Sequence, residues 1–393
     1  MSPDIALLRD LDTLREQNLF RKLRRVDSPQ SAHLEIDGKS YLNFSSNDYL
    51  GLANHPALKQ AAIQAIETFG AGAGSARLVC GSLAPFHDLE AALAKFKQTG
   101  AALSFSTGYA AALGTIGALV GRNDIIILDK LVHACIVDAA KLSGAKIRVF
   151  AHNDLDDLEK KLKWATHSGR SSAKARILIV TESIFSMDGD APPLREIVTL
   201  KEKYGAWLMV DEAHATGILG KHGRGLADHL GLGSQIEIQM GTLGKALGAS
   251  GGFICGSRPL IDLLVNRARS FVFSTAPVPA AAAAATAAIQ IAQSPEGEKL
   301  RKRLKSLTEQ FQSEIHSQKS KIPAAIIPIL VGDEKKAMKT AEKLNEQGFF
   351  VPAIRYPSVA RGAARLRVTL TAAHSPEDIS RLVSALKTLD IGL

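Results

Sequence analysis

The chain has 393 residues, 46% hydrophobic and 22% charged, and 48 lysines and arginines against 39 acidic residues give it a formal net charge of +9. This composition is typical of a globular protein and excludes intrinsic disorder, in which low hydrophobicity accompanies high charge. Cys80, Cys135 and Cys255 are scattered and odd in number, which excludes a disulfide scaffold and favours a reducing compartment, the cytoplasm.

The positive charge leaves nucleic acid, a membrane surface or an anionic substrate open as partners. The basic clusters at 21–25 and 301–305 are short, and the aromatic residues that would stack bases between them are missing. Acidic residues occupy the start of the chain, where a signal peptide requires a basic and then an apolar run. No apolar stretch reaches the roughly 18 residues that span a bilayer. We therefore expect neither a nucleic-acid partner nor a membrane.

In chain order, the predicted elements begin with a charged helix and a hairpin at His33–Tyr41 that turns at Asp37-Gly38. Seven short apolar runs follow, with amphipathic stretches such as 155–164 and 194–204 between most of them. This alternation predicts an α/β fold with a mostly parallel, seven-stranded sheet. The last two runs are joined by a glycine-rich segment, so one of them can run antiparallel. The runs are 102–106, 125–128, 147–151, 177–180, 207–210, 236–240 and 253–255.

The pattern changes after about residue 290. A long helix is followed by an apolar strand at 325–330, a helix at 335–347, a strand at 366–370 and a final helix. We predict an N-terminal segment at 1–50, a large domain at 51–290 and a small C-terminal α+β domain at 291–393.

Polar side chains follow five of the predicted strands. Ligands of open α/β sheets bind outside the carboxyl ends of the strands, so these residues are the first candidates for a site. In chain order the candidates at these strand ends, one glycine among them, are Gly108, Tyr109, Asp129, His133, Glu182, Ser186, Asp211, His214, Thr242 and Lys245.

Two of these residues suggest a particular chemistry. Lys245 lies among small residues in GTLGKALGASGG, a setting in which a lysine can lose its proton and form a Schiff base with a carbonyl; the alternative is an ordinary exposed lysine. Asp211 follows a buried strand and needs a partner, for which a protonated pyridine nitrogen would fit; the alternative is a helix N-cap. His133 and His214 can each be structural or face the same ligand.

Three glycine-rich segments depart from the motifs of phosphate-loop proteins, dinucleotide-binding proteins and hydrolases. A phosphate loop would need Gly and Ser or Thr where Gln239 and Ala246 stand, and GAGAGSAR at 70–77 misses the dinucleotide fingerprint at Ser75. The segment 248–252 matches the GxSxG of hydrolases, but it leads into a strand rather than a helix.

Longer motifs resemble a known family. VDEAHATG, followed about 30 residues later by GTLGKA, resembles the fold-type-I pyridoxal-phosphate (PLP) enzymes. Narrower motifs resemble the α-oxoamine synthases within that class: LNFSSNDYLGL at 42–52, TESIFSMDGDAPPL at 181–194, VDEAHATGILGKHGRG at 210–225 and RLRVTLTAAHS at 365–375. The resemblance implies a fold-type-I PLP-dependent transferase with a smaller C-terminal α+β domain.

It also implies a cofactor site. Lys245 would carry PLP as an aldimine and then act as the base, Asp211 would pair with the pyridine nitrogen, and His133 would stack on the ring. His214 and Ser186 would contact the phenolic oxygen. The groups implied to hold the phosphate are Gly108, Tyr109, Thr242 and, from the neighbouring subunit of a homodimer with shared sites, Ser274 and Thr275. No metal is expected.

The substrate contacts implied by the resemblance are Arg21, Asn47, His133, Ser358 and Arg367, the last of these at the amino-acid carboxylate. LNFSSNDYLGL, FAHND at 150–154 and TLTAAH most resemble the members that condense L-alanine with a pimeloyl thioester, on coenzyme A or acyl carrier protein, with loss of CO2 in biotin synthesis. Sister enzymes that use glycine or serine, and a non-catalytic protein of the same fold, stay open as alternatives.

This sequence departs from the family pattern in one motif, where GAGAGSAR at 70–77 replaces the commoner GSGGSR, and at three further positions. Cys135 stands where the family usually has Ser, Ser358 where it usually has Thr, and Ala360 where it usually has Pro. The hydroxyl of Ser358 keeps a substrate contact available, whereas the effect of the other two changes is left open.

Overall fold

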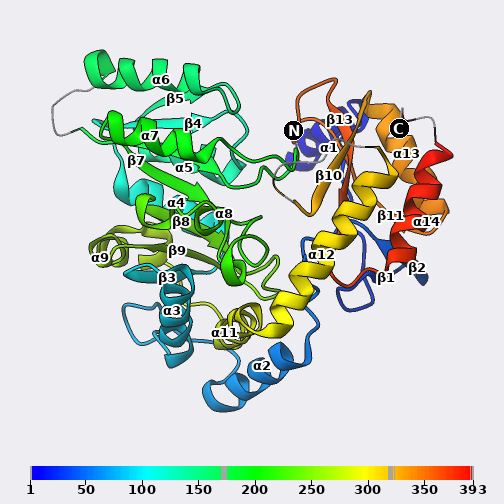
Figure 1. Cartoon of the computed structure of the whole chain (residues 1–393), viewed down its shortest axis with the longest axis horizontal. Coiled ribbons are helices and arrows are strands. Elements are labelled where there is room, and N and C mark those ends of the chain that lie inside the picture. Colours follow the sequence, from blue (N-terminus) through cyan, green and yellow to red (C-terminus); the bar gives the residue numbers. More distant parts are fainter. Residues whose placement is uncertain (1, 170–174, 317–321, 323, 390, 392–393) are drawn as a thin grey trace.

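The computed structural model describes residues 2–169, 175–316, 322, 324–389 and 391. Figure 1 shows two lobes joined by the long helix α12 (Pro295–Glu314). The larger lobe is built around a seven-stranded sheet, and the smaller one contains the hairpin near the N-terminus and the part of the chain that follows α12. None of the described helices is both long and apolar enough to cross a bilayer.

All seven predicted strands are present, and their order across the sheet is β3-β9-β8-β7-β6-β4-β5. Only β9 runs against its neighbours, pairing antiparallel with β3 and β8, so the mostly parallel sheet and the one reversed strand are confirmed. The strands are β3 (Ala101–Phe105), β4 (Ile125–Asp129), β5 (Lys146–Phe150), β6 (Ile177–Glu182), β7 (Trp207–Asp211), β8 (Ile238–Thr242) and β9 (Gly252–Gly256).

Helices cover both faces of this sheet because alternate side chains of its central strands point to opposite faces. Along β4, Ile126 and Leu128 join one apolar cluster with α4 and α5, whereas Ile125 and Ile127 join another with α6 and α7. The first face carries α4 (Gly108–Leu119), α5 (Ala134–Ser143), α9 (Arg258–Arg267) and α10 (Arg269–Val272), and the second carries α6 (Leu155–Trp164), α7 (Leu194–Lys203) and α8 (Leu226–His229).

Three further helices pack together at the side of the large lobe: α2 (Pro56–Phe69), α3 (Ala84–Lys97) and α11 (Pro279–Gln293). Eight residues of the alanine-rich α11 are buried. Single turns of 3₁₀-helix occupy Lys221–Gly223 and Gly233–Gln235, and a π-helical turn occupies Ala165–Gly169.

The small lobe contains two three-stranded sheets. In the first, the predicted hairpin of β1 (His33–Ile36) and β2 (Lys39–Asn43) is extended by β11 (Phe349–Phe350), which pairs with β2 in parallel. Asp37 and Gly38 turn the hairpin with φ of 50° and 73°. The second sheet has the order β10 (Ile326–Gly332), β13 (Ala364–Thr369), β12 (Ala353–Ile354). The remaining helices are α1 (Pro3–Glu16), α13 (Glu334–Glu346) and α14 (Pro376–Lys387).

The pairing of β2 with β11 places residues from both ends of the chain in one sheet. The division of the chain at residues 50 and 290 stays a prediction.

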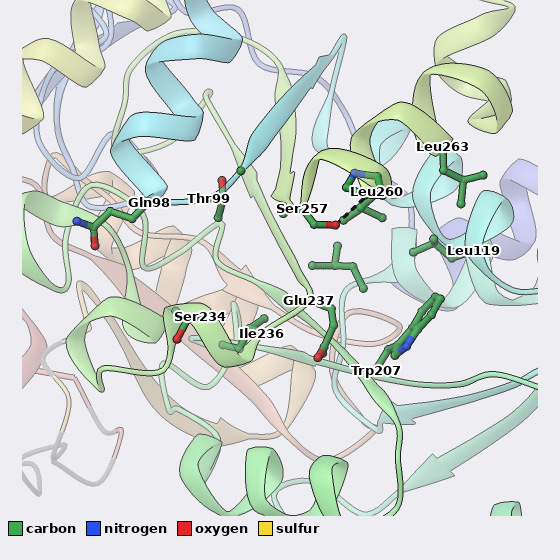
Figure 2. A pocket seen from close by; sticks show the side chains of 15 residues that line it. Gln98, Thr99, Leu119, Trp207, Ser234, Ile236, Glu237, Ser257, Leu260 and Leu263 are labelled. Carbon is green, nitrogen blue, oxygen red and sulfur yellow. Dashed lines mark hydrogen bonds between the residues drawn. The ribbon is translucent and has the colours of Figure 1, made fainter.

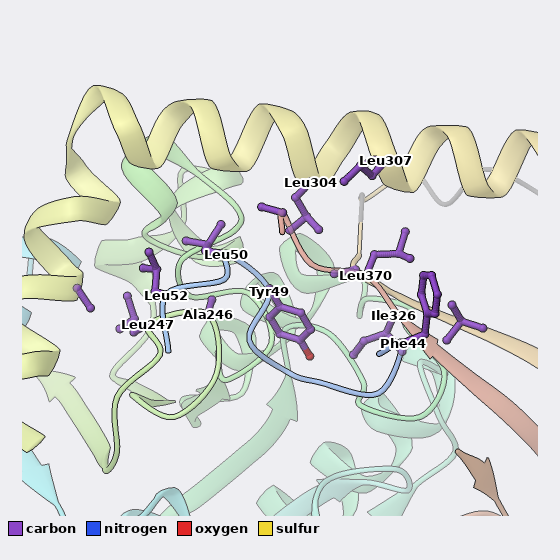
Figure 3. Packing of buried hydrophobic residues seen from close by; sticks show 14 of the residues in the cluster. Phe44, Tyr49, Leu50, Leu52, Ala246, Leu247, Leu304, Leu307, Ile326 and Leu370 are labelled. Atoms are coloured by element: carbon purple, nitrogen blue, oxygen red, sulfur yellow. The ribbon is translucent and has the colours of Figure 1, made fainter. Parts of the chain in front are cut away.

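One apolar cluster joins the two lobes beneath α12 (Figure 3). Tyr49 and Leu50, in the segment that follows the hairpin, pack between Leu304 of α12 and Leu247 of the large lobe. Tyr49 and Leu50 are at most 1% exposed. The cluster therefore fixes the segment around Tyr49 beside the turn that carries Lys245.

Candidate active site

The acidic candidates end neighbouring strands at one edge of the sheet. Asp129, Glu182 and Asp211 are the last residues of β4, β6 and β7, and Glu182 lies opposite Asp211 in the strand register. Thr242 ends β8, the next strand along. The structure thus brings the predicted strand-end residues together.

Lys245 lies in the turn between β8 and β9, half-buried, with Nζ 2.7 Å from Nε2 of His214. A Cβ on Gly248 would lie 2.5 Å from the backbone of Leu52 and Ala53, so the glycine lets this turn pack tightly against that segment. Burial lowers the pKa of Lys245, and the nearby carboxylates of Asp211 and Glu182 oppose this shift. The geometry is not that of an ordinary exposed lysine.

His214 links Lys245 to the small lobe through Tyr49. The Tyr49 hydroxyl lies 2.5 Å from Nδ1 of His214 and 3.2 Å from Oδ1 of Asn47. Burial lowers the pKa of His214 well below its ordinary value and raises that of Tyr49 to about 12, so both side chains are neutral near pH 7. Sequence reasoning quoted Tyr49 within a motif but did not identify it as a site residue.

Arg367 completes this chain of contacts from β13. Its guanidinium donates to the Ser186 carbonyl at 2.6 Å, to Oγ1 of Thr369 at 3.1 Å and to Oδ1 of Asn47 at 3.1 Å. The side chain is nearly buried, with 5% of the residue exposed. Ser186, Asn47 and Arg367, which lie far apart in the sequence, are therefore in contact.

Asp211 is buried, and its Oδ1 accepts a hydrogen bond from the Ala213 amide at 2.9 Å. Residues 213–218 form turns rather than an α-helix, so the N-cap alternative is wrong. Burial raises the pKa of Asp211, and the charge of Lys245 opposes the shift. Within the described ranges no ion pair to Asp211 is formed. A buried carboxylate without a fixed cation fits the protonated pyridine nitrogen of PLP.

Glu182 and His133 lie beside Asp211. The His133 amide donates to Oε1 of Glu182 at 2.5 Å, and His133 is the N-cap of α5. Burial raises the pKa of Glu182 well above its ordinary value and lowers that of His133. Cys135 lies with Sγ 3.0 Å from Nδ1 of His133, and burial raises the pKa of this thiol to about 12. The cysteine therefore remains a thiol that contacts His133.

The amino end of α4 has the features of an anion-binding site. Thr107 caps the helix by accepting from the Ala110 amide at 3.0 Å, and Gly108 is its first residue. A Cβ on Gly252 would lie 2.5 Å from the Thr107 carbonyl, so this glycine lets β9 approach the start of the helix. Helix amino termini carry partial positive charge and free N–H groups, which fits a phosphate. The hydroxyl of Thr242 donates to Gly251 O at 3.0 Å.

The remaining candidates are less closely joined to Lys245. Tyr109 is 42% exposed, and its hydroxyl donates to Asp138. Ser274 and Thr275 line a small cavity together with Ser106, just before the start of α4. Their roles stay predictions.

Arg21 and Ser358 are exposed. A 2.8 Å hydrogen bond from Arg355 Nε to the Asn18 carbonyl brings the segments that contain these two residues together. The structure shows no contact of either with Lys245, so their substrate contacts also stay predictions.

A cavity lies at the opposite edge of the sheet (Figure 2). It measures about 600 Å³ and is lined mainly by apolar side chains, including Trp207 at the start of β7 and Leu260 of α9. None of the candidate residues lines it.

The fold and the strand-end site define the class of PLP-dependent enzymes of fold type I. The model of the family described as aminotransferase class I and II matches residues 39–386. A solved serine palmitoyltransferase from S. paucimobilis with a bound PLP–myriocin aldimine superposes with a TM-score of 0.89 at 29% identity, covering 98% of this chain and 96% of that one.

Two comparisons identify the family within this class. The chain is 47% identical over 380 residues, 96% of each chain, to 8-amino-7-oxononanoate synthase of Geobacter sulfurreducens. A solved 8-amino-7-oxononanoate synthase from Francisella tularensis superposes with a TM-score of 0.74 at 27% identity, covering 88% of this chain and 97% of that one. The chain belongs to the 8-amino-7-oxononanoate synthase family.

Proposed function

We propose that this protein condenses L-alanine with a pimeloyl thioester, carried on coenzyme A or acyl carrier protein, to give 8-amino-7-oxononanoate, CO2 and the free carrier in biotin synthesis. The observation that carries the proposal is the 47% identity to a curated synthase across 96% of both chains. Lys245, His214 and Asp211, at one edge of the sheet, support it. The new bond joins Cα of alanine to the thioester carbonyl carbon; the thiolate and CO2 leave.

PLP, when bound, withdraws electrons from Cα of the amino acid joined to it. The Asp211 carboxylate would hold the proton on the ring nitrogen, and the ring of His133 would lie against the cofactor. The start of α4 would hold the phosphate. Lys245 would attach the cofactor through Nζ and, once released by alanine, would take the proton from Cα and later return one. Its lowered pKa favours the neutral amine that this role requires.

Arg367 would bind the carboxylate of alanine, because a guanidinium matches a carboxylate in a bidentate pair. Asn47 and Ser186 hold the guanidinium in place, and the chain from Tyr49 through His214 holds Nζ of Lys245. The substrate carboxylate and the reacting amine would thereby be held by residues of two different lobes.

We also propose that the active protein is a cytoplasmic homodimer with shared sites. Leu78, Val79 and Phe273 are 53%, 79% and 72% exposed, and a β-bridge between Ala76 and Thr275 joins the two segments that carry them. Such an apolar surface beside Ser274 and Thr275 supports a partner copy there. A sedimentation measurement that finds a monomer at micromolar concentration would count against the dimer.

The proposal is tested by two measurements on purified protein. Saturation with PLP is expected to give a visible absorbance band that Lys245→Ala lacks and the exposed-lysine control Lys59→Ala retains. Release of the free thiol carrier is then followed with pimeloyl-CoA or pimeloyl acyl carrier protein and alanine, glycine or serine. Alanine is expected to give the fastest turnover. Faster turnover with glycine or serine would contradict the substrate assignment, and absence of the band in wild type would contradict the whole proposal.

A further inference from the structure

The segment between β6 and α7, residues 183–193 and here called the β6–α7 loop, lies between the two lobes. Its residue Gly189 has φ of +69°, and a Cβ there would lie 2.3 Å from the Ile326 carbonyl of β10. The loop therefore packs its backbone directly against the sheet of the small lobe. Only a glycine allows this approach, since the position combines a left-handed φ with no room for a side chain.

Two arginines of β13, in the small lobe, form hydrogen bonds to the β6–α7 loop. Arg367 donates to the Ser186 carbonyl at 2.6 Å. Arg365 donates to the Met187 carbonyl at 3.2 Å and forms an ion pair with Asp188, NH1 to Oδ1, at 2.6 Å. The Arg365 side chain is 11% exposed and that of Asp188 31%. A partly buried, charge-assisted contact of this kind constrains position more than an ion pair in open solvent does.

The other end of the loop is fastened to the large lobe through His152. Its Nε2 lies 2.9 Å from Oδ2 of Asp190, and its Nδ1 lies 2.9 Å from Oδ1 of Asp129 at the end of β4. Asn153 adds a hydrogen bond to Asp190 at 2.9 Å. The ring of Phe185, in the loop itself, meets the His152 ring edge-on at 4.4 Å. With a carboxylate at each ring nitrogen, the imidazole donates from both.

We propose that the β6–α7 loop couples the two lobes, and that Arg365 with Asp188 and His152 with Asp190 are positioning pairs that set where Arg367 stands relative to Lys245. Neither pair touches the reacting atoms. The inference rests on the proposed function only in taking Arg367 as the group that binds the amino-acid carboxylate.

Arg365→Met removes the ion pair and keeps an apolar stem of similar length. We expect the amino-acid concentration that half-saturates the change in cofactor absorbance to rise about threefold to thirtyfold, the usual range for residues that couple to a site without touching its ligand. The KM for the thioester and the binding of PLP are expected to stay within about twofold of wild type, because the contacts of Lys245 and Asp211 are unchanged.

Asp188→Asn removes the negative charge of the same ion pair and keeps the size of the side chain. It is therefore also expected to raise the amino-acid concentration that half-saturates the absorbance change. The double variant should be no worse than Arg365→Met, since both changes break one interaction. Arg365→Lys keeps the charge and should restore part of the loss. Glu298→Gln, which breaks an exposed ion pair with Lys302 on α12, is the matched control and should change none of these quantities.

A second readout needs neither cofactor nor activity. The Phe185 amide donates to Asp190 O at 2.9 Å and the Gly189 amide to Phe185 O at 2.8 Å, both within the loop. Arg365→Met is expected to speed their hydrogen exchange at least threefold, and Glu298→Gln to leave it unchanged. Unchanged exchange together with unchanged half-saturation would overturn the coupling.

An equal loss of PLP binding and of affinity for both substrates would also overturn it, by showing a merely structural role. The amino-acid titration separates this result from a failure of the proposed function. If wild-type holoprotein does not respond to alanine, glycine or serine, the proposed function fails, and the hydrogen-exchange readout still tests the loop.

Discussion

Tyr49→Phe tests whether the chain of contacts from Tyr49 through His214 controls the protonation of Lys245. The substitution removes only the hydroxyl that lies 2.5 Å from Nδ1 of His214. The hydroxyl has one proton. Donated to Nδ1, the nearer acceptor at 2.5 Å against 3.2 Å for Oδ1 of Asn47, it leaves Nε2 to carry the ring proton and donate to the neutral amine of Lys245, 2.7 Å away. Without it, His214 can place its proton on Nδ1 and accept from the ammonium form instead.

The expected consequence is a higher pKa of Lys245. Burial lowers this pKa in the wild type, and the change of tautomer replaces a contact that favours the neutral amine with one that favours the charged form. A hydrogen bond to a charged group contributes about 1.5–3 kcal/mol. Part of this is offset by lost contacts, so we expect a rise of about one pKa unit, which corresponds to ~1.4 kcal/mol.

The measurement is the rate at which an amine-selective reagent modifies Lys245 in the cofactor-free protein, followed by mass spectrometry as a function of pH. The midpoint of the wild type should lie below that of an exposed lysine, and that of Tyr49→Phe about one unit above the wild type. Tyr204→Phe, which removes a hydroxyl that donates to Glu159 at 2.8 Å away from the site, is the control. An unmoved midpoint in Tyr49→Phe, or an equal move in Tyr204→Phe, would refute the reasoning.

Two further outcomes concern stability. Lys97 and Glu212 form an ion pair with Nζ 2.9 Å from the carboxylate, and their side chains are 1% and 0% exposed. Lys97→Met should therefore lower the free energy of unfolding, measured by urea titration, by about 3–5 kcal/mol, because it leaves the buried charge of Glu212 without a partner. Lys302→Met, which breaks an exposed ion pair, should change it by less than ~1 kcal/mol. Burial alone would lower the pKa of His152, but its hydrogen bonds to Asp129 and Asp190 raise this pKa from 6.5 to about 10. The charged imidazole therefore stabilises the folded protein fully below pH 6.5, and this contribution is lost as the pH rises through 10. His152→Asn should flatten that alkaline loss, and an unchanged slope between pH 7 and 10 would contradict the assignment.

The sheet could be predicted because its strands are short, continuous apolar runs covered on both faces. The least accurate strand was β8, expected at 236–240 and found at Ile238–Thr242. Gly241 and Thr242 continue it because they pair with Phe253 and Gly252 of the reversed strand β9, and glycine carries no strand signal in the sequence. The strands β11 and β12 were missed because each has only two residues, too few to show the alternation of apolar and polar side chains that marks a strand.

In the site, sequence order identified the residues that share a sheet edge but not those that meet across the lobes. Asp211, His214 and Lys245 follow neighbouring strands, so the rule for α/β sheets places them together. Tyr49 and His214 are 165 residues apart, and Arg365 and Asp188 are 177 apart. These contacts exist because the apolar cluster beneath α12 joins the lobes, and no local pattern in the chain records which side chains that packing brings together.

For Arg367, which the sequence identified only as a candidate, the structure adds the contacts that hold its guanidinium. A guanidinium has five N–H donors; its contacts with Ser186, Thr369 and Asn47 use one on each nitrogen, and a further hydrogen bond joins it to the Tyr49 hydroxyl. These contacts fix the plane of the guanidinium, and because one of them is made to the Ser186 carbonyl, the position of Arg367 depends on the β6–α7 loop.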